Sequence, residues 1–205
     1  QFTGTVTTAT VVDGFRIQGG GGRTFANIPY AGTYGGGVMI NGTSPTLRNL
    51  VVTGNTVGGS SELGIGGGLA LHNSEAVLEN IEVTGNSAIY GAGVFIHRGT
   101  PQLTDVVIED NTVFLDNFNE PAIGGGLHIV DSAPVLQNVD VRGHLGARSG
   151  GGVWISDVNE TASVTWTGGE ISGNSAEQFG GGLAITGGDH QLQDLTITGN
   201  VQTAV

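Results

Sequence analysis

Histidine, arginine and aromatic side chains are the residues of this sequence that are best suited to binding a ligand or taking part in a reaction. The middle position of a short apolar–x–apolar phrase is occupied by Phe95, His128 and Trp154 on three successive phrases, and His72 and His97 directly follow such a phrase. Alternate residues of a β-strand point to opposite faces, so a middle residue points away from its apolar neighbours. Aromatic rings with polar neighbours suit the apolar side of a sugar ring. We therefore expect a glycan-binding face formed by Phe95, His128, Trp154, His72, His97 and Arg98. The alternative is that loops cover the aromatic rings.

Metal binding and catalysis have weaker support. One acidic loop offers oxygen ligands for Ca²⁺ from Asp110, Asp116, Asn119 and Glu120, although it lacks the alternating ligand spacing of a calcium hand. Calcium is therefore the one cofactor that the sequence suggests. The three histidines lack a carboxylate at a fixed position that could complete a metal site. We assign no catalytic residue, because nothing fixes the distances between Arg98 and the carboxylates of Asp131 and Asp157.

The overall composition excludes several classes of partner. The formal net charge is −12, and all 6 basic residues are arginine, so the chain lacks the basic surface that nucleic acid or an anionic membrane requires. There is no cysteine for a disulfide or a thiolate metal site. No apolar stretch approaches the roughly 18 residues of a membrane-spanning helix. We expect no direct membrane insertion.

The elements that position these residues come from an internal repeat. Glycine accounts for 39 of 205 residues and recurs in triplets. An apolar–x–apolar phrase follows each triplet, two more follow later, and a Gly-Asn pair or a relative closes the unit. The triplets start at Gly35, Gly66, Gly91 (as Gly-Ala-Gly), Gly124, Gly150 and Gly180.

Three short alternating segments per unit, none able to bury itself alone, indicate strands that stack on their equivalents in neighbouring units. The sequence therefore predicts an all-β, right-handed parallel β-helix (a solenoid) of about seven coils with three short strands each, right-handedness being the default for parallel connections. We expect residues 1–205 to form a single β-helix domain, a slice of a longer solenoid or a unit that stacks end to end. The long insertions 23–34, 56–65 and 112–123 should rim the first sheet.

The recurrent asparagines have a structural explanation. Asn or Asp stands between the second and third phrases, where a sharp corner needs a left-handed backbone conformation: Asn49, Asn80, Asp105, Asn138 and Asp194. The Asn of each Gly-Asn pair should form a second ladder along the rod, with His144 as its odd member. The glycine triplets should lie where positive φ and tight stacking are required.

The segments Gly85–Val94 and Gly173–Leu183, both of the form Gly-Asn-Ser-Ala followed by a glycine-rich triplet, resemble repeats of polymorphic outer-membrane proteins and autotransporter passengers. They are also similar to the wider group of secreted bacterial right-handed parallel β-helix repeat proteins. The resemblance implies an extracellular or bacterial cell-surface location. That group includes adhesins, surface proteins and carbohydrate-active enzymes.

We expect a non-enzymatic structural or adhesive module whose partners are neighbouring β-helix coils or subunits, stacked end to end, together with a glycan. The alternative is a carbohydrate-active enzyme, a polysaccharide lyase or glycoside hydrolase, that uses the same face. Lyases of this architecture use a lysine or arginine base with acidic calcium ligands, and lysine is absent here.

Overall fold

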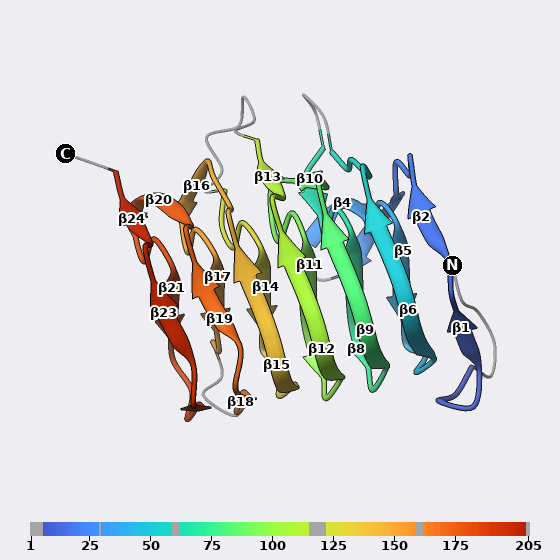
Figure 1. The fold of residues 1–205 in the computed structure, drawn as a ribbon. Helices are drawn as coiled ribbons and strands as arrows, with labels where there is room; N and C mark the ends of the chain where they lie inside the picture. The colour runs from blue at the N-terminus through green and yellow to red at the C-terminus, as the bar shows by residue number, and fades with distance from the viewer. Residues whose placement is uncertain (1–5, 29, 59–61, 115–121, 159–161, 204–205) are drawn as a thin grey trace.

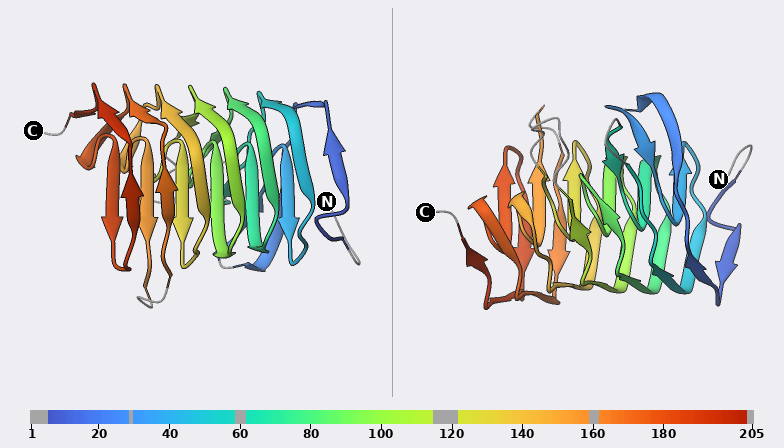
Figure 2. Two further views of the ribbon diagram at one scale, coloured as in Figure 1. Left: turned by 60° about the horizontal axis from the view of Figure 1, so that its bottom comes forward. Right: turned by 90° about the horizontal axis from the view of Figure 1, so that it is seen from above.

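The computed structural model describes residues 6–28, 30–58, 62–114, 122–158 and 162–203, and it shows a rod of stacked β-coils (Figure 1). Successive coils lie side by side along the rod axis, and the chain runs steadily from one end to the other (Figure 2). Five complete turns separate the first glycine triplet from the last, fewer than the seven coils expected. The described residues before the first triplet add no strand to the six-stranded sheet and so form only part of a coil. Among the described residues, no helix is long and apolar enough to cross a membrane.

The first apolar phrase of each unit forms a strand of a parallel six-stranded sheet. Its members pair in the register that the repeat predicts, for example Phe95 with His128 and His128 with Trp154. The strands are β5 (Val38–Asn41), β8 (Leu69–Ser74), β11 (Val94–Gly99), β14 (Leu127–Val130), β17 (Val153–Ser156) and β21 (Leu183–Thr186).

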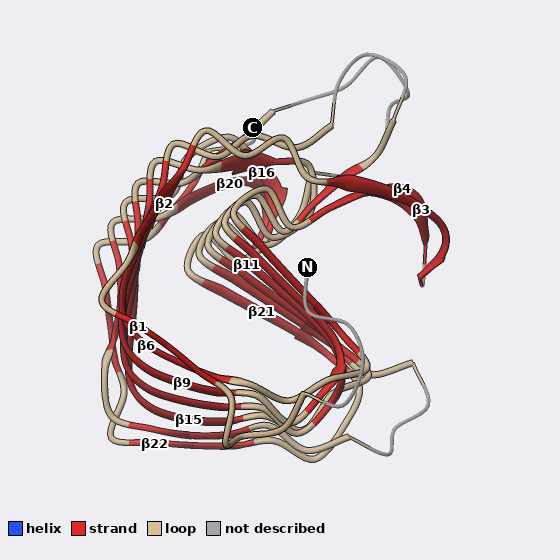
Figure 3. Cartoon of the chain, turned by 90° about the vertical axis from the view of Figure 1, so that its right-hand side faces the viewer, coloured by secondary structure: helices blue, strands red, loops and turns tan. Residues whose placement is uncertain are grey.

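The second and third phrases build one L-shaped sheet rather than two separate sheets (Figure 3). In four coils a single eight-residue strand runs through the corner, at a residue with φ near +50°, such as Asn80. The strands are β1 (Val11–Asp13), β2 (Arg16–Gln18), β6 (Thr46–Thr53), β9 (Val77–Thr84), β12 (Gln102–Glu109), β15 (Val135–Arg142), β18 (Thr165–Thr167), β19 (Glu170–Ser172), β22 (Gln191–Gln193) and β23 (Thr196–Thr198).

A third wall, which we call the short-strand wall, lies in the segments that the sequence suggested were loops. Its strands are β7 (Gly64–Ile65), β10 (Ser87–Ala88), β13 (Thr112–Val113), β16 (Ala147–Ser149), β20 (Ser175–Phe179) and β24 (Val201–Gln202). The first insertion forms an antiparallel hairpin of β3 (Arg23–Ile28) and β4 (Tyr30–Tyr34), and β4 pairs with β7. These short segments form strands because stacked coils hold neighbouring backbones within hydrogen-bonding distance.

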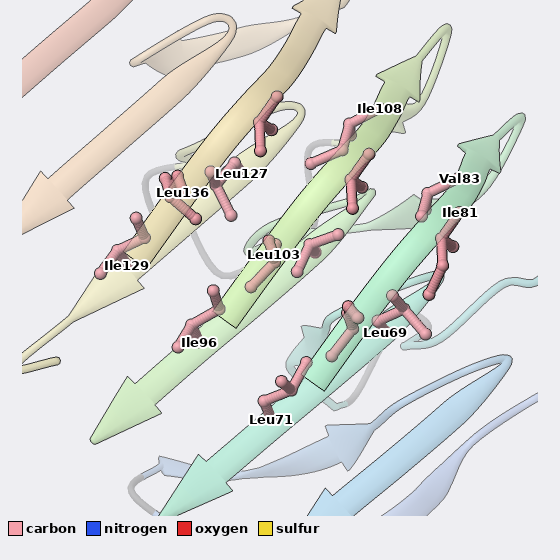
Figure 4. Packing of buried hydrophobic residues seen from close by; sticks show 14 of the residues in the cluster. Leu69, Leu71, Ile81, Val83, Ile96, Leu103, Ile108, Leu127, Ile129 and Leu136 are labelled. Atoms are coloured by element: carbon pink, nitrogen blue, oxygen red, sulfur yellow. The ribbon is translucent and has the colours of Figure 1, made fainter. Parts of the chain in front are cut away.

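The main core fills the space between the six-stranded sheet and the L-shaped sheet (Figure 4). Each interior position forms a row of like side chains along the rod, such as Leu71, Ile96 and Ile129. Trp166 continues a row of leucines and is fully buried, with its Nε1–H donating to the Gly168 carbonyl at 3.0 Å. Because nearly every row repeats side chains of similar size, every coil can follow the same backbone path.

A buried amide ladder runs beside this core, as the Gly-Asn repeat predicts. Nδ2 of Asn86 donates to Oδ1 of Asn111 at 2.9 Å, and Oδ1 of Asn86 accepts from Nδ2 of Asn55 at 2.8 Å. Each amide also accepts a backbone N–H from the preceding coil, as in Asn55 N to Asn86 Oδ1 at 3.0 Å. The third glycine of each triplet packs on this ladder; a Cβ on Gly68 would lie 3.0 Å from Nδ2 of Asn86 and 2.7 Å from the Gly93 carbonyl oxygen. The amide ladder therefore fits beside the triplets only because these positions are glycine.

His144 occupies one rung of this ladder and is fully buried. Its Nδ1 accepts the backbone N–H of Asn111 at 3.1 Å, and its Nε2 lies 3.1 Å from the Ile108 carbonyl, to which it donates. Burial lowers the pKa of His144, and backbone hydrogen bonds to Asn111 and Ile108 oppose that effect. A neutral imidazole thus replaces the amide.

We expect Asn86→Ala to lower the free energy of unfolding by about 3 kcal/mol, because the substitution leaves several buried polar groups without partners. Chemical denaturation measures the change. Asn80→Gly is the matched control: it removes an exposed corner rung, tolerates positive φ, and should cost less than about 1 kcal/mol. Equal losses in the two variants would contradict a structural role for the buried ladder.

We expect His144→Asn to fold normally and to be less sensitive to acid. A pKa lowered in the folded state gives stability above pH ~6.5 that is lost as the pH falls below that value. The free energy of unfolding of the variant should therefore rise relative to that of the parent by up to about 1.4 kcal/mol per pH unit as the pH drops from 6.5. Denaturant midpoints at a series of pH values measure this gain, and a constant difference between the two proteins would contradict the assignment.

Candidate functional site

The outer face of the six-stranded sheet is covered along its first coils by a second core. This second core contains Tyr34, Met39, Ile65, Ala70, Ile89, Tyr90, Phe95 and Val130, with Phe25, Ile28, Leu63, Phe114 and Ile123 packed against it. The β3–β4 hairpin arches over this face (Figure 3). Edge-to-face contacts bind the cover to the sheet, with ring centroids 6.2 Å apart for Tyr34 and Phe95.

The expectation of an open aromatic strip is therefore wrong for two of its members. Phe95 is 0% exposed and His128 is 2% exposed, so neither can contact a ligand in this conformation. Both side chains do point away from the main core, as alternation predicts, but the short-strand wall and the hairpin bury them. Burial lowers the pKa of His128 to about 3, and His97 contributes a smaller electrostatic effect.

His72 and His97 form a directly hydrogen-bonded pair on neighbouring strands. Their Nδ1 atoms are 2.8 Å apart, and their nearly parallel rings have centroids 4.9 Å apart. The centroids are much farther apart than the nitrogens, so the rings meet edge to edge rather than face to face. One Nδ1 must therefore carry a hydrogen and the other a lone pair. Burial is the main cause that lowers both pKa values, that of His97 to about 4.

Arg98 follows His97 at a corner where the backbone is left-handed, with φ 58°. The same corner is occupied by Asn73 one coil earlier and by Asp131 one coil later, with φ 48° and 45°. An arginine in this conformation is strained, unlike Asn or Asp. Its exposed guanidinium lowers the pKa of both His72 and His97.

The two carboxylates at this end of the sheet both accept backbone N–H groups. Asp131 accepts the backbone N–H of Val158 at 2.9 Å, and Asp157 accepts that of Ala162 at 2.6 Å. Within the described ranges there is no ion pair between Arg98 and either acid. Asp131 opposes the lowering of the His97 pKa and raises that of Tyr30. The structure thus places two histidines, an arginine and one acid at the same end of the sheet.

Trp154 lies beyond the hairpin and remains half-buried. Phe179, on the next coil, is 63% exposed, although it stands directly before its glycine triplet as the buried Tyr34 and Tyr90 do. The short-strand wall continues here through β16 and β20, and the half-buried Arg148 lies on β16. We call this half, which lies beyond the described hairpin, the Trp154 platform; it comprises Arg148, Trp154, Ser156, Phe179 and Thr186.

The calcium expectation falls mostly on positions 115–121, which lie outside the described residues. Asp116, Asn119 and Glu120 are among them, and Asp110 is an exposed corner residue with φ 50°. In the part of the chain that the structure describes, no three histidine, aspartate or glutamate side chains are arranged to hold a metal ion. Calcium binding by the loop stays a prediction.

A hollow of about 400 Å³ lies on the L-shaped sheet, lined by Glu82, Asp105 and Glu109 among others. Arg142 contacts Glu109 at 2.8 Å and Asp140 at 3.3 Å within this region. These pairs are partly exposed and contribute little to stability. They locally balance the negative charge of the face.

Sequence reasoning missed the inward role of the residue before each glycine triplet. This position holds Tyr34, Ile65, Tyr90, Ile123, Ser149 and Phe179. An apolar or aromatic residue at five of these six positions was a detectable signal for the second core. The expected rim of the sheet is instead its cover.

We expect Arg98→Asn to raise the free energy of unfolding by about 1 kcal/mol, because Asn tolerates the left-handed conformation. The pKa values of His72 and His97 should rise, since a nearby cation is removed. Denaturation and imidazole NMR titrations measure the two effects. Arg16→Asn, on an exposed strand, is the control and should change neither quantity. Unchanged histidine pKa values in Arg98→Asn would contradict the electrostatic assignment.

Comparison with known proteins agrees with this architecture. The family model described as the right-handed β-helix region matches residues 4–201. No curated protein matches the chain significantly, and no solved structure does. The match covers nearly the whole sequence, and the stacked parallel coils have the form that it describes. The chain therefore belongs to the right-handed β-helix family.

Proposed function

We propose that the chain is a non-enzymatic structural or adhesive β-helix module, located outside the cell or on its surface, that binds glycan at the Trp154 platform. The family includes both structural or adhesive and polysaccharide-active members, so the choice rests on the site. The observation that carries the proposal is the covered sheet. Phe95 and His128 occupy the face where an enzyme of this form would place its substrate, with 0% and 2% exposure.

The carboxylates give a second argument against the enzymatic alternative. Hydrolysis of a glycosidic bond requires two carboxyl groups at a defined separation on either side of the bond. Asp131 and Asp157 instead accept backbone N–H groups of the following segments. In these roles they stabilise the turns after β14 and β17.

The Trp154 platform offers what a sugar ring requires. The partly exposed indole of Trp154 provides an apolar surface. Ser156 lies two residues further along the same strand, and its paired neighbour Thr186 supplies a second hydroxyl group. A rigid sheet positions these groups without a folding cost on binding.

We further propose that the last coil pairs with another β-coil. Ile185 is 43% exposed and Ile197 is 52% exposed, whereas their equivalents one coil earlier, Ile155 and Ile171, are buried. A stacked coil would bury both side chains and continue their rows. This part of the proposal is independent of glycan binding.

Screening against a panel of immobilised polysaccharides tests glycan binding. Trp154→Ala should weaken the strongest interaction at least about tenfold, which corresponds to about 1.4 kcal/mol. Phe15→Ala is the matched control, because Phe15 is 59% exposed in the turn between β1 and β2, outside the six-stranded sheet, and its loss should leave binding unchanged. The absence of any glycan binding, or equal loss in both variants, would overturn the platform. Release of new chain ends from a bound polysaccharide would overturn the non-enzymatic assignment.

A further inference from the structure

Three of the five histidines cluster at the second core, and the one at its centre, His128, has one ring nitrogen without a hydrogen-bond partner among the described residues. His128 is 2% exposed, and its Nδ1 makes no hydrogen bond to any described residue. Its ring contacts Phe95 and Tyr90, with centroids 5.2 Å and 5.9 Å away. An imidazolium at this position would be a buried, uncompensated charge.

The His72–His97 pair next to it also accommodates little positive charge. Its Nδ1–Nδ1 hydrogen bond of 2.8 Å requires one hydrogen between the two nitrogens, so the pair can carry one additional proton but not two. A second additional proton would put a hydrogen on both Nδ1 atoms, so that two N–H donors would point at each other. The pair and His128 are connected through Phe95, whose ring centroid is 6.5 Å from that of His97.

The charged and titratable groups around these histidines give little compensation. Arg98, on β11, adds positive charge beside both members of the pair. Asp131, after β14, is the acid that acts on His97, and it also accepts the Val158 backbone N–H. The cover contributes Tyr30 from β4 and Tyr90 from the segment before Gly91. Glu62 faces the hairpin from its other side, hydrogen bonded to Thr33 at 2.6 Å.

The hairpin is attached to the rod by short backbone pairing, a few hydrogen bonds and aromatic contacts. β4 pairs with β7 through two residue pairs, Thr33 with Gly64 and Tyr34 with Ile65. The Thr33 backbone N–H donates to the Leu63 carbonyl at 2.8 Å, and the hydroxyls of Thr24 and Thr33 donate to Glu62. The aromatic contacts include Tyr34 with Phe95 at 6.2 Å and Tyr30 with Tyr90 at 5.8 Å. By contrast, β11 pairs along its length with β8 on one side and β14 on the other. Loss of the aromatic contacts would free the hairpin before the rod.

We propose that His72, His97 and His128 form an acid-sensitive catch: while neutral they hold the β3–β4 hairpin closed over the six-stranded sheet, and their protonation releases it. Opening admits water to the imidazolium groups and uncovers Phe95 and Tyr90, while the main core and the amide ladder keep the rod folded. The released state thus presents an aromatic face that the closed state hides.

The lowered pKa values of all three histidines determine that closure is favoured at high pH and opening at low pH. A histidine that stays neutral in the closed form but titrates normally in the open form contributes to closure above pH ~6.5. That contribution is lost as the pH falls from 6.5 toward about 4 for His97 and about 3 for His128. Each such histidine can shift the closed-to-open ratio by up to about tenfold per pH unit.

The three tyrosines of the chain, Tyr30, Tyr34 and Tyr90, all belong to this region, so tyrosine-selective NMR reports on the catch alone. On titration of the full chain from pH 7 to pH 3, we expect the tyrosine ring signals to change with an acid midpoint while far-ultraviolet circular dichroism retains the β-signal. The imidazole signals should titrate together with the tyrosine signals. Imidazole titration without a tyrosine response would overturn the proposal, and so would loss of both signals in one global transition.

Substitutions identify the groups responsible. Asn41 occupies the position equivalent to His72 and His97 on strand β5, so His72→Asn and His97→Asn introduce a residue type that this position already holds. Met39 likewise occupies the β5 position equivalent to His128, which suggests His128→Met. The triple variant should lose the acid transition of its tyrosine signals. The control His190→Asn, on the last coil, should keep the parental midpoint. A triple variant that folds at pH 7 and keeps that midpoint would overturn the proposal; should it not fold, the parental titration still decides.

Discussion

The structure depends on one constraint, which is that each coil must follow the same backbone path as its neighbours. Only then does each strand N–H find a carbonyl one coil away, since parallel pairing joins chain segments 25 residues apart (Leu69 with Val94) to 35 residues apart (Val11 with Thr46). The buried amide ladder enforces this spacing, because each rung accepts hydrogen bonds from the preceding rung. A buried polar chain of this kind is costly when incomplete. It therefore tolerates substitution only by a group with matching donor and acceptor positions, as His144 illustrates.

The glycine triplets follow from the same constraint. Their first members adopt φ between 56° and 65°, and their third members leave room for the amide rung beneath and the carbonyl of the next coil. A composition that would suggest flexibility in isolation thus gives rigidity here, because the glycines permit close stacking. The sharp turn that they create also folds the short-strand wall back toward the outer face of the six-stranded sheet. Because the wall folds back in this way, its side chains can pack on the outer face of the six-stranded sheet and form the second core.

The second core changes the functional interpretation of the sheet. In an open parallel β-helix the outward face is available to ligands, but here aromatic side chains from the hairpin and from before each triplet fill its first half. Burial then decides the chemistry of the histidines, because it lowers the pKa values of His128 and of the His72–His97 pair and so favours their neutral forms. The proposed glycan site therefore lies in the half beyond the hairpin, around Trp154. The same chain thus forms both a rod and a sheet face that is covered along its first coils.

By itself the sequence determined the repeat, the parallel coils, the left-handed corners at Asn49 and its equivalents, the amide ladder with His144 as a member, and the column that places Phe95, His128 and Trp154 on successive strands. These features are local or periodic, so spacing and alternation report them directly. Tertiary structure alone decided that the two later strands merge into one bent strand, that insertion 23–34 forms a hairpin over the sheet, and that Phe95 is buried while Trp154 is not. Alternation specifies the side of a sheet on which a residue lies. Only the path of a non-repeating insertion specifies whether that side meets water.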